Sequence, residues 1–241
     1  ADPDGLETRD AGPVTTMKNG LSNGRVDVRF DRRGRISRLS IDGATIAQAA
    51  PMAEIRIFDD LPHGFDAWDI DRSALTEGRA LKDPCDLQFE SAPGTASCVV
   101  EQPISDESRI RVRYEVRAGS PVLHITCEVD WHEQNTLMKL VFPTCYQGEH
   151  ARYGAPFGST RRSQHPGKPY DEAQWEVAGS RYAAVGDDTE EDGLFIATEA
   201  KYGWTCRAGT LGLSLLRSAR MPEANENGGL YATSYRTPHT D

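Results

Sequence analysis

The feature that most constrains this chain is a two-residue alternation of charged and apolar side chains. It is clearest in Arg109-Ile-Arg-Val-Arg-Tyr-Glu-Val-Arg117, where every second residue is apolar. Successive side chains of a β-strand point to opposite faces, so this pattern predicts an antiparallel strand with one face in a core and the other in water. Shorter runs of the same kind recur along the chain, with turn residues between them roughly every eight to twelve residues, as in β-sandwiches.

These runs predict an all-β fold, an antiparallel β-sandwich with little helix, because no segment shows a long 3.6-residue period with capping residues. The polar residues 1–16 are expected to be a lead-in, and residues 17–241 a single β-sandwich domain, an ordinary size for this class. The expected strands lie at residues 25–30, 35–39, 53–58, 86–90, 97–101, 109–117, 122–131, 137–142, 181–185, 193–198 and 210–216. The Gly- and Pro-rich residues 146–174 and the polar residues 221–229 are expected to be loops.

Composition excludes several classes of function. With 27 Lys and Arg against 37 Asp and Glu, the formal net charge is −10, whereas nucleic-acid phosphates require a basic patch. No run of eighteen apolar residues occurs, so nothing predicts a membrane span. We therefore expect neither nucleic-acid nor membrane partners, and a soluble protein for which the cytoplasm is the favoured compartment. The 5 cysteines form no C-x-x-C pair, which predicts free thiols and no zinc finger.

The most unusual segment runs from Phe58 to Asp71 and holds three aromatic residues and five aspartates in fourteen positions. Asp at this density favours a loop, where its carboxylate bonds nearby backbone N–H groups. Trp68 must either pack against the edge of the core or present a ring face to a ligand. Sugars offer C–H faces to aromatic rings and hydroxyls to carboxylates, so a Trp/Asp loop suits carbohydrate recognition. The default is a structural pin, with Asp66 and Asp69 bonding backbone groups of the loop.

The acidic residues give only weak candidates for a catalytic or metal site. Hydrolysis of a glycosidic bond with retention needs two carboxylates about 5 Å apart. Neighbouring acids are Asp66, Asp69 and Asp71, and also Asp171, Glu172 and Glu176. The first group also offers oxygen ligands for Ca²⁺ but lacks EF-hand spacing, and zinc bound by His63 with these aspartates is a weaker candidate still. We expect no catalytic residue and no metal site in this chain.

Two basic residues of the expected loop 146–174 are candidates for contacts to a substrate. Arg161 can clamp a hydroxyl or carboxylate through its planar guanidinium, although solvation or an ion pair within the domain is the default. His165 lies four residues further on, and solvent exposure or an ordinary hydrogen bond is its default. Neither residue has a spacing that identifies a metal site.

Five stretches of the chain match the motifs of one family, in the family's order. Asp60-Leu-Pro-His-Gly-Phe-Asp-Ala-Trp-Asp-Ile-Asp71 is similar to D-x-P-x-x-x-D-A-W-D. The other four are Asn19–Ile36, similar to N-G…L-x-V-x-F-D-x-x-G-R-I; Pro156–His165, similar to P-[FY]-G-S-x-x-R-x-x-H; Trp175–Tyr182, similar to F-E-V-x-x-x-R-W; and Lys201–Ser218, similar to K-Y-G…G-x-x-L-x-L-S-L-L-R-S. Each stretch is weak alone, but five in one order resemble glycoside hydrolase family 38, the α-mannosidases.

The matched stretches belong to the family's C-terminal all-β region, so the resemblance implies a supersandwich of the galactose mutarotase type. In that family a divalent, zinc-like metal and the nucleophilic Asp lie in and just after a separate N-terminal domain. The resemblance therefore implies a piece of a longer retaining α-mannosidase, without a cofactor of its own. Its expected partners are that catalytic domain and an α-mannoside substrate. The candidates for contacts to the sugar are Trp68, Asp69, Asp66, His63, Arg161 and His165.

The alternative hypothesis is a stand-alone carbohydrate-binding or mutarotase-like module, because the family's β-region shares that architecture. An epimerase needs a His base and a Glu acid that converge in a cleft. The near pairs are His124 with Glu128 and His132 with Glu133, and strand alternation puts His124 and Glu128 on one face. Binding of mannose without turnover would favour a binding module, and interconversion of anomers an epimerase.

Overall fold

The computed structural model describes residues 12–62, 69–75, 78–81, 84–189, 192–224 and 230–235. Every strand pair among them is antiparallel, and the helices among them are a 3₁₀ turn, η1 (Arg72–Leu75), and the four-residue α1 (Pro169–Glu172). The prediction of an all-β, antiparallel fold with little helix is confirmed. The chain packs into two compact units, Ala1–Ile46 with Lys82–Asp130 and Ala47–Leu81 with Trp131–Asp241. A single domain over residues 17–241 stays a prediction.

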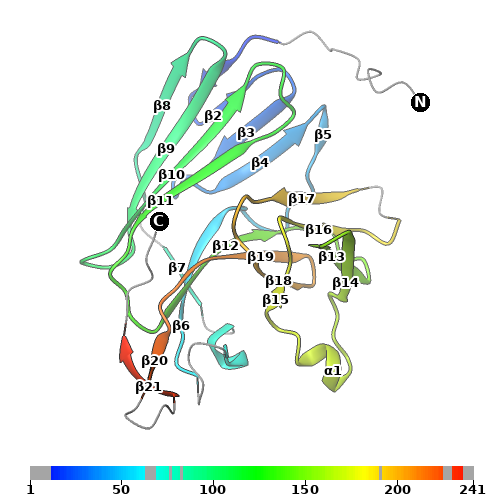
Figure 1. Cartoon of the computed structure of the whole chain (residues 1–241). Coiled ribbons are helices and arrows are strands. Elements are labelled where there is room, and N and C mark those ends of the chain that lie inside the picture. The colour runs from blue at the N-terminus through cyan, green and yellow to red at the C-terminus, as the bar shows by residue number, and fades with distance from the viewer. Residues whose placement is uncertain are drawn as a thin grey trace. The chain divides into compact units, whose positions relative to one another are not determined.

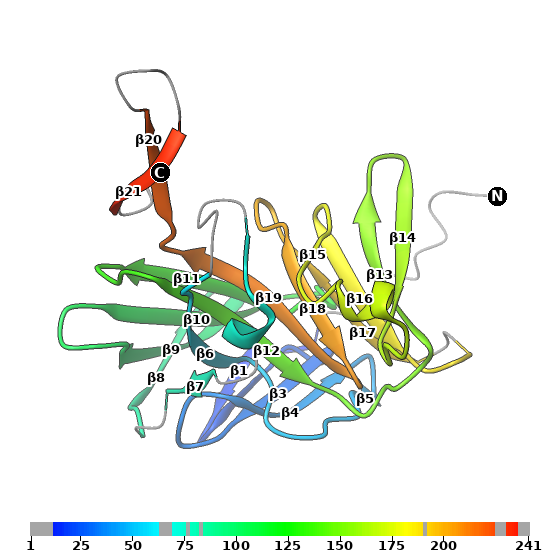
Figure 2. The same ribbon diagram turned by 90° about the horizontal axis from the view of Figure 1, so that it is seen from below.

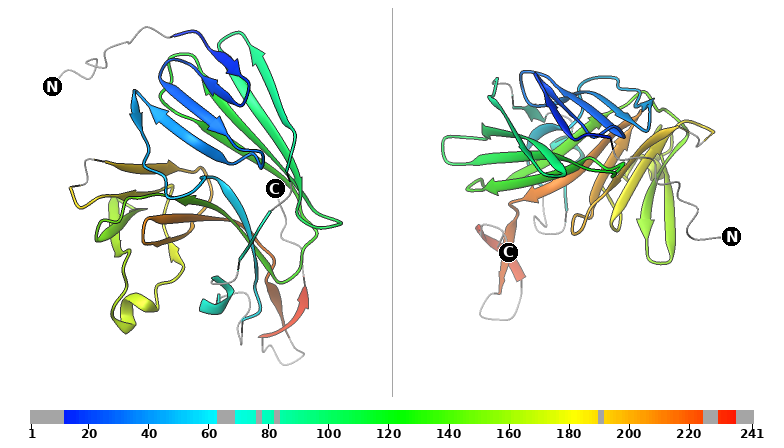
Figure 3. Two further views of the ribbon diagram at one scale, coloured as in Figure 1. Left: turned by 180° about the vertical axis from the view of Figure 1, so that it is seen from behind. Right: turned by 90° about the horizontal axis from the view of Figure 1, so that it is seen from above.

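The first unit consists of two antiparallel sheets that pack against each other (Figure 1, Figure 3). Their strand orders are β1-β2-β3-β4-β5 and β11-β10-β9-β8. The strands are β1 (Thr15–Met17), β2 (Gly20–Ser22), β3 (Val26–Phe30), β4 (Ile36–Ile41), β5 (Ala44–Thr45), β8 (Leu87–Ala92), β9 (Thr95–Pro103), β10 (Arg109–Arg117) and β11 (His124–Asp130). The expected hairpins at residues 25–39 and 86–101 are both present, as β3–β4 and β8–β9.

Strand alternation builds the core of this unit as predicted. The apolar residues of β10 are all buried: Ile110, Val112, Tyr114 and Val116. The ring of Phe30, at the end of β3, lies with its centroid 4.8 Å from that of Tyr114. Burial of the Tyr114 hydroxyl raises its pKa well above the ordinary range. The charged face of β10 remains toward water, where Arg113 and Arg117 pair with Glu115.

The second unit contains a six-stranded sheet, a four-stranded sheet and a hairpin (Figure 2). The six-stranded sheet has the order β15-β18-β19-β12-β6-β7. Its strands are β6 (Glu54–Asp59), β7 (Arg79–Ala80), β12 (Thr136–Pro143), β15 (Val177–Ala178), β18 (Gly203–Arg207) and β19 (Thr210–Arg217). The other strands are β13 (His150–Ala155), β14 (Gly158–Ser163), β16 (Tyr182–Gly186) and β17 (Gly193–Ala197), with β20 (Arg220–Ala224) and β21 (Leu230–Tyr235) in the hairpin.

The two loop predictions are wrong over part of their length. Residues 146–174 contain the β13–β14 hairpin and α1, and residues 220–224 form β20, while residues 225–229 lie outside the described part of the chain. The glycines of residues 146–174 suggested a loop, but not all of them lie in turns. Gly154 lies inside β13, where a Cβ would come within 2.0 Å of the Ser180 carbonyl oxygen. This glycine therefore permits a close backbone approach within a sheet.

The β3–β4 turn yields a test of packing in the first unit. Gly34 has a φ of +71°, and a Cβ there would lie 2.6 Å from the Val100 side chain, whereas Gly94 has a φ of +77° and open space around it. Both Gly34→Ala and Gly94→Ala add left-handed strain of about 1 kcal/mol. Only Gly34→Ala also overlaps a neighbour, which typically costs a further 1–3 kcal/mol or so. We expect urea unfolding to show this extra loss for Gly34→Ala; equal losses in the two variants would refute it.

Candidate functional site

The six-stranded sheet of the second unit has two chemically different faces. On one face the apolar residues Ile55, Leu140, Leu213 and Trp204 lie directly opposite one another across four neighbouring strands. On the other face Lys139 pairs in register with Arg56 on one side and Ser214 on the other. We call this second surface the polar face and define it by Glu54, Arg56, Asp60, Lys139, Ser214 and Arg217. Such a face is unusual for a central strand and requires partners for its buried charges.

A β-bulge in β19 makes the polar face possible. Met138 pairs with Leu216, but the next residue, Lys139, pairs with Ser214, so Leu215 is an extra residue. Ser214 and Arg217 are three positions apart and would point to opposite faces of a regular strand. The bulge brings both onto the polar face, since a bulge re-aims the side chains that follow it. Their contacts with Lys139 and Asp60 agree with this placement.

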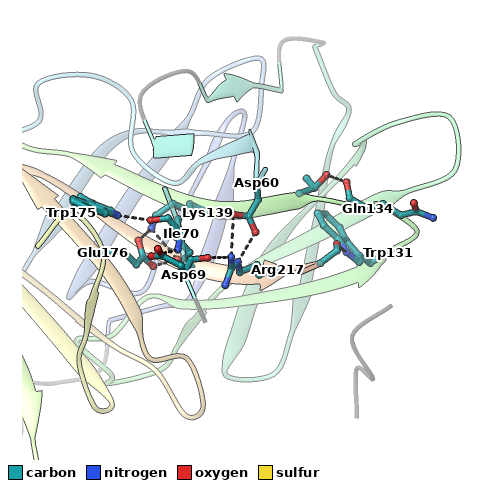
Figure 4. Close-up of polar contacts among 12 residues, drawn as sticks. Asp60, Asp69, Ile70, Trp131, Gln134, Lys139, Trp175, Glu176 and Arg217 are labelled. Carbon is teal, nitrogen blue, oxygen red and sulfur yellow. Dashed lines mark hydrogen bonds and ion pairs between the residues drawn. The ribbon is translucent and has the colours of Figure 1, made fainter. Parts of the chain in front are cut away.

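Lys139 is the most buried cation of the polar face, with 2% of its side chain exposed. Its Nζ donates to Ser214 Oγ at 2.9 Å and to the carboxylate of Glu176. Ser214 Oγ also donates to Glu176 Oε1 at 2.5 Å, which closes a network of three residues. Figure 4 shows Lys139 beside Glu176. Desolvation lowers the pKa of Lys139, and the charge and hydrogen bond of Glu176 oppose that effect. Gly203 provides the space, because a Cβ there would lie 2.6 Å from Glu176 Oε1.

Arg217 links the two ends of the Asp/Trp segment. Its Nε donates to Oδ2 of the buried Asp60 at 2.5 Å, and its Nη2 donates to Oδ1 at 3.2 Å. This is the fork-to-carboxylate geometry that makes Arg–Asp pairs strong and directional. Nη2 also donates to the carbonyl oxygen of Asp69 (Figure 4). One guanidinium thus holds the residues on both sides of 61–68, and we call this arrangement the Arg217 clamp.

Two more contacts fix the chain that follows this segment. Trp175 Nε1 donates to the carbonyl oxygen of Ile70 at 2.7 Å. Arg72 and Glu172 form an ion pair at 2.5 Å, which joins η1 to α1. Since Glu176 comes directly after Trp175, the segment that holds Ile70 also supplies the carboxylate to Lys139. The clamp, the lysine network and the residues around α1 therefore form one connected structure.

This geometry can position a loop rigidly, but it does not provide an acid/base pair. The carboxylate of Asp60 is bound by Arg217 and that of Glu176 by Lys139. A third carboxylate of the polar face, Glu54, pairs with Arg56 at 2.6 Å. Carboxylates held by cations in this way are not arranged as the two catalytic carboxyl groups of a retaining glycosidase, which lie about 5 Å apart on either side of the scissile bond. The network therefore acts as a framework that holds Asp60, Asp69 and Ile70.

The structure describes three of the six residues expected to contact a sugar. His63, Asp66 and Trp68 lie outside the described residues. Asp69 is exposed, and its Oδ1 accepts a hydrogen bond from Ile70 N–H at 2.9 Å, so its carboxylate does bond the backbone of the segment. Arg161 is exposed on β14, and His165 Nε2 lies 3.1 Å from the carbonyl oxygen of Gln147. These two residues belong to the β13–β14 region, whereas Asp69 belongs to the Arg217 clamp.

Sequence reasoning did not identify the buried residues of this site. Lys139 offered a signal, because a lysine inside the apolar run Leu137–Phe142 must be paired if the run is a central strand. Asp60 and Arg217 are 157 positions apart and carry no local signal for their pairing. Glu176 was visible only as one acid among many. Long-range pairing of this kind depends on strand order, which single-sequence patterns do not determine.

The remaining candidate chemistry is limited. Within the described ranges, no group of three His, Cys, Asp or Glu side chains is arranged to hold a metal ion, and no helix there has the length and apolar character of a membrane span. All five cysteines are free thiols. Burial raises the pKa of Cys98 and of Cys206 to about 12, and desolvation raises that of Cys85 to about 11. Such thiols are poor nucleophiles at neutral pH.

Comparison with known proteins places this site in a family. The sequence pattern of the family described as "Glycosyl hydrolases family 38 C-terminal domain" matches residues 21–225. The chain is 30% identical over 225 residues to Alpha-mannosidase 2C1 of Homo sapiens, covering 91% of this chain and 21% of that protein. It is 28% identical over 193 residues to the Alpha-mannosidase of Saccharomyces cerevisiae, covering 76% of this chain and 18% of that protein. The chain thus spans about a fifth of the length of these relatives.

A solved structure shares the fold. The crystal structure of an alpha-mannosidase from Enterococcus faecalis V583 superposes with a TM-score of 0.75 at 13% sequence identity. The superposition covers 92% of this chain and 28% of the Enterococcus chain. At this identity the comparison establishes the fold alone; like the sequence matches, it covers most of this chain and a minor part of the other protein.

The lysine network predicts a pH-dependent effect of Glu176→Gln. The change leaves a buried ammonium without a counter-charge, so we expect a loss of about 3 kcal/mol in the free energy of unfolding at pH 7. It also removes the group that raises the pKa of Lys139. In the folded variant, desolvation then lowers the pKa of Lys139 without opposition. The Lys139 ammonium therefore loses its proton at a lower pH in the folded variant than in the unfolded chain, where a lysine titrates at about 10.4. Its deficit relative to the parent protein should shrink as the pH rises from 7 toward 10.

The measurement is urea unfolding of both proteins at pH 7 and pH 9.5. Glu172→Gln is the matched control, because Glu172 and Arg72 are 35% and 57% exposed and such a pair contributes under about 1 kcal/mol. We expect the control to show a small loss that does not recover at alkaline pH. A deficit for Glu176→Gln that stays constant or grows with pH would show that the buried charge of Lys139 is not its cause.

Proposed function

Because the chain belongs to the family of glycosyl hydrolases family 38 C-terminal domains, we propose that it is the C-terminal β domain of an α-mannosidase-like retaining glycosidase. The observation that carries the proposal is coverage: the chain is matched over 91% of its own length but over only 21% of a relative named Alpha-mannosidase 2C1. A separate N-terminal domain would contain the catalytic residues, and the substrate would be an α-mannoside.

The framework character of the site supports this role. In the described part of the chain, the carboxylates of the polar face are all engaged by cations. The Arg217 clamp fixes the residues on either side of 61–68, which include His63, Asp66 and Trp68. We propose that these residues and Asp69 line one wall of the sugar cleft, and that Arg161 and His165 extend it. The β domain would then shape the cleft, while the chemistry belongs to the other domain.

The divalent metal implied by the family resemblance is assigned to that other domain. Among the described residues, no three potential ligands come together, so they do not fit a zinc-like site. For the fold, we propose one supersandwich of the galactose mutarotase type over residues 17–241. This is supported by the antiparallel sheets, the scarcity of helix and the TM-score of 0.75 with an alpha-mannosidase structure.

The proposal predicts that residues 1–241 alone do not hydrolyse aryl α-mannosides, because the chain lacks a free carboxylate pair on its polar face. The test compares release of 4-nitrophenol from 4-nitrophenyl α-mannoside by this chain and by the longer protein, each with added divalent metal. We expect turnover only by the longer protein. Robust metal-dependent turnover by residues 1–241 would move the active site into the β domain, and interconversion of mannose anomers would favour a mutarotase-like module instead.

Trp68→Ala tests whether the loop acts as a structural pin or contacts substrate. A buried indole contributes about 3–5 kcal/mol, so a pin predicts a fall of several degrees in the melting temperature of this chain. A ring stacked on sugar predicts instead an unchanged melting temperature and roughly a five- to hundred-fold loss of kcat/KM in the longer enzyme. We expect the structural outcome. Tyr202→Ala, which removes an aromatic ring that is 54% exposed, is the control and should change neither quantity.

A further inference from the structure

Three arginines line an open cavity in the first unit. Its volume is about 440 Å³, within the range of about 300–1,000 Å³ that is usual for small-molecule sites. Arg32, Arg33 and Arg35 of the β3–β4 turn line it, together with Asn19 and the apolar residues Phe30 and Leu87. This local positive charge contrasts with the formal net charge of the chain, which is −10. The cavity is distinct from the polar face and the Arg217 clamp, which belong to the other unit.

The turn that presents these arginines is rigidly built. Oδ1 of Asp31 accepts hydrogen bonds from the backbone N–H groups of Arg33 and Arg35, at 2.9 and 3.0 Å. The carbonyl oxygen of Arg32 accepts a hydrogen bond from Cys85 N–H at 3.0 Å, which ties the turn to the chain before β8. Gly34 packs directly against Val100. A ligand would therefore meet side chains that extend from a fixed backbone, which reduces the ordering that binding requires.

The three guanidinium groups are not equivalent. Arg35 is engaged, because it pairs with Oδ2 of Asp31 at 2.7 Å. The side chains of Arg32 and Arg33 make no hydrogen bond or ion pair with any residue that the structure describes. Asp31 is the single acidic residue among those that line the cavity, and its carboxylate is already occupied by the turn and by Arg35. Two guanidinium groups thus border one cavity without an acceptor among the residues that the structure describes.

We infer that this cavity binds a small phosphorylated ligand, with Arg32 and Arg33 as the groups that recognise its phosphoryl oxygens. A guanidinium presents its N–H donors in a planar fork that matches phosphate geometry. A dianionic phosphoryl group can accept from both forks at once, which a single carboxylate does less completely. The half-buried Leu87 provides an apolar surface for the carbon skeleton of the ligand, whereas Phe30 is buried beneath the cavity. This inference is independent of the proposed mannosidase role, because it concerns a different unit of the chain.

The experiment is calorimetric titration of the full chain with three probes: inorganic phosphate, glucose 6-phosphate and glucose. A buffer of low ionic strength is required, since salt screens exposed charges. We expect saturable binding of glucose 6-phosphate, weaker binding of phosphate and no binding of glucose. The double variant Arg32→Gln/Arg33→Gln should bind the phosphorylated sugar at least about tenfold more weakly, because each lost charge-assisted contact is worth more than one factor of ten at most sites.

Arg38→Gln is the matched control. Arg38 is exposed on β4 of the same hairpin, carries the same charge and does not line the cavity. We expect its affinity for glucose 6-phosphate to stay within about twofold of the parent value, and the melting temperatures of all three proteins to agree, because none of these side chains is buried. Absence of saturable binding by the parent protein would overturn the inference. So would an equal loss of affinity in Arg38→Gln, or an unchanged affinity in the double variant.

Discussion

The organisation of the second unit depends on one extra residue in β19. Without the bulge at Leu215, Ser214 and Arg217 would lie on opposite faces of the six-stranded sheet. Either the lysine network or the Arg217 clamp would then lose its hydrogen-bonding partner, and a buried charge would be left without compensation. The bulge thus couples two ion pairs that stand at different points of the sheet. It also leaves the apolar face intact, since Leu216 and Leu213 remain aligned with Met138 and Leu140.

Buried ion pairs of this kind contribute little net stability. Removing two charges from water is costly, and replacing such pairs by well-packed apolar residues is often neutral or stabilising, whereas removing one partner is strongly destabilising. Asp60 and Lys139 are fully enclosed, with 0% and 2% of their side chains exposed. The main effect of these ion pairs is therefore to fix the positions of the segments that they join. Arg217 bonds Asp60 and the carbonyl oxygen of Asp69 at once, so the clamp fixes these two residues relative to each other.

The fold was largely predictable from sequence, and the site was not. The strand at residues 109–117 follows from alternation, because every second residue is apolar and a strand places all of these side chains on one face, toward the core. The β13–β14 hairpin was missed because Gly154 and Pro156 look like turn residues, although Gly154 serves close packing within the sheet. The clamp was missed for a different reason. Nothing near Asp60 or Arg217 in the sequence indicates which strand neighbours which, and the bulge that aligns them is set by tertiary pairing.

The positions of the family motifs explain why the resemblance to mannosidases is informative about structure. The stretch 60–71 contributes Asp60 and Asp69, the stretch 175–182 contributes Trp175 and Glu176, and the stretch 201–218 contributes Gly203, Ser214 and Arg217. Three stretches far apart in sequence therefore meet at the polar face. The stretch 19–36 behaves in the same way in the first unit, where Asp31 and Gly34 build the turn. Residues that build a frame can be shared by proteins whose ligands differ, so these motifs identify the domain and its frame rather than a particular ligand.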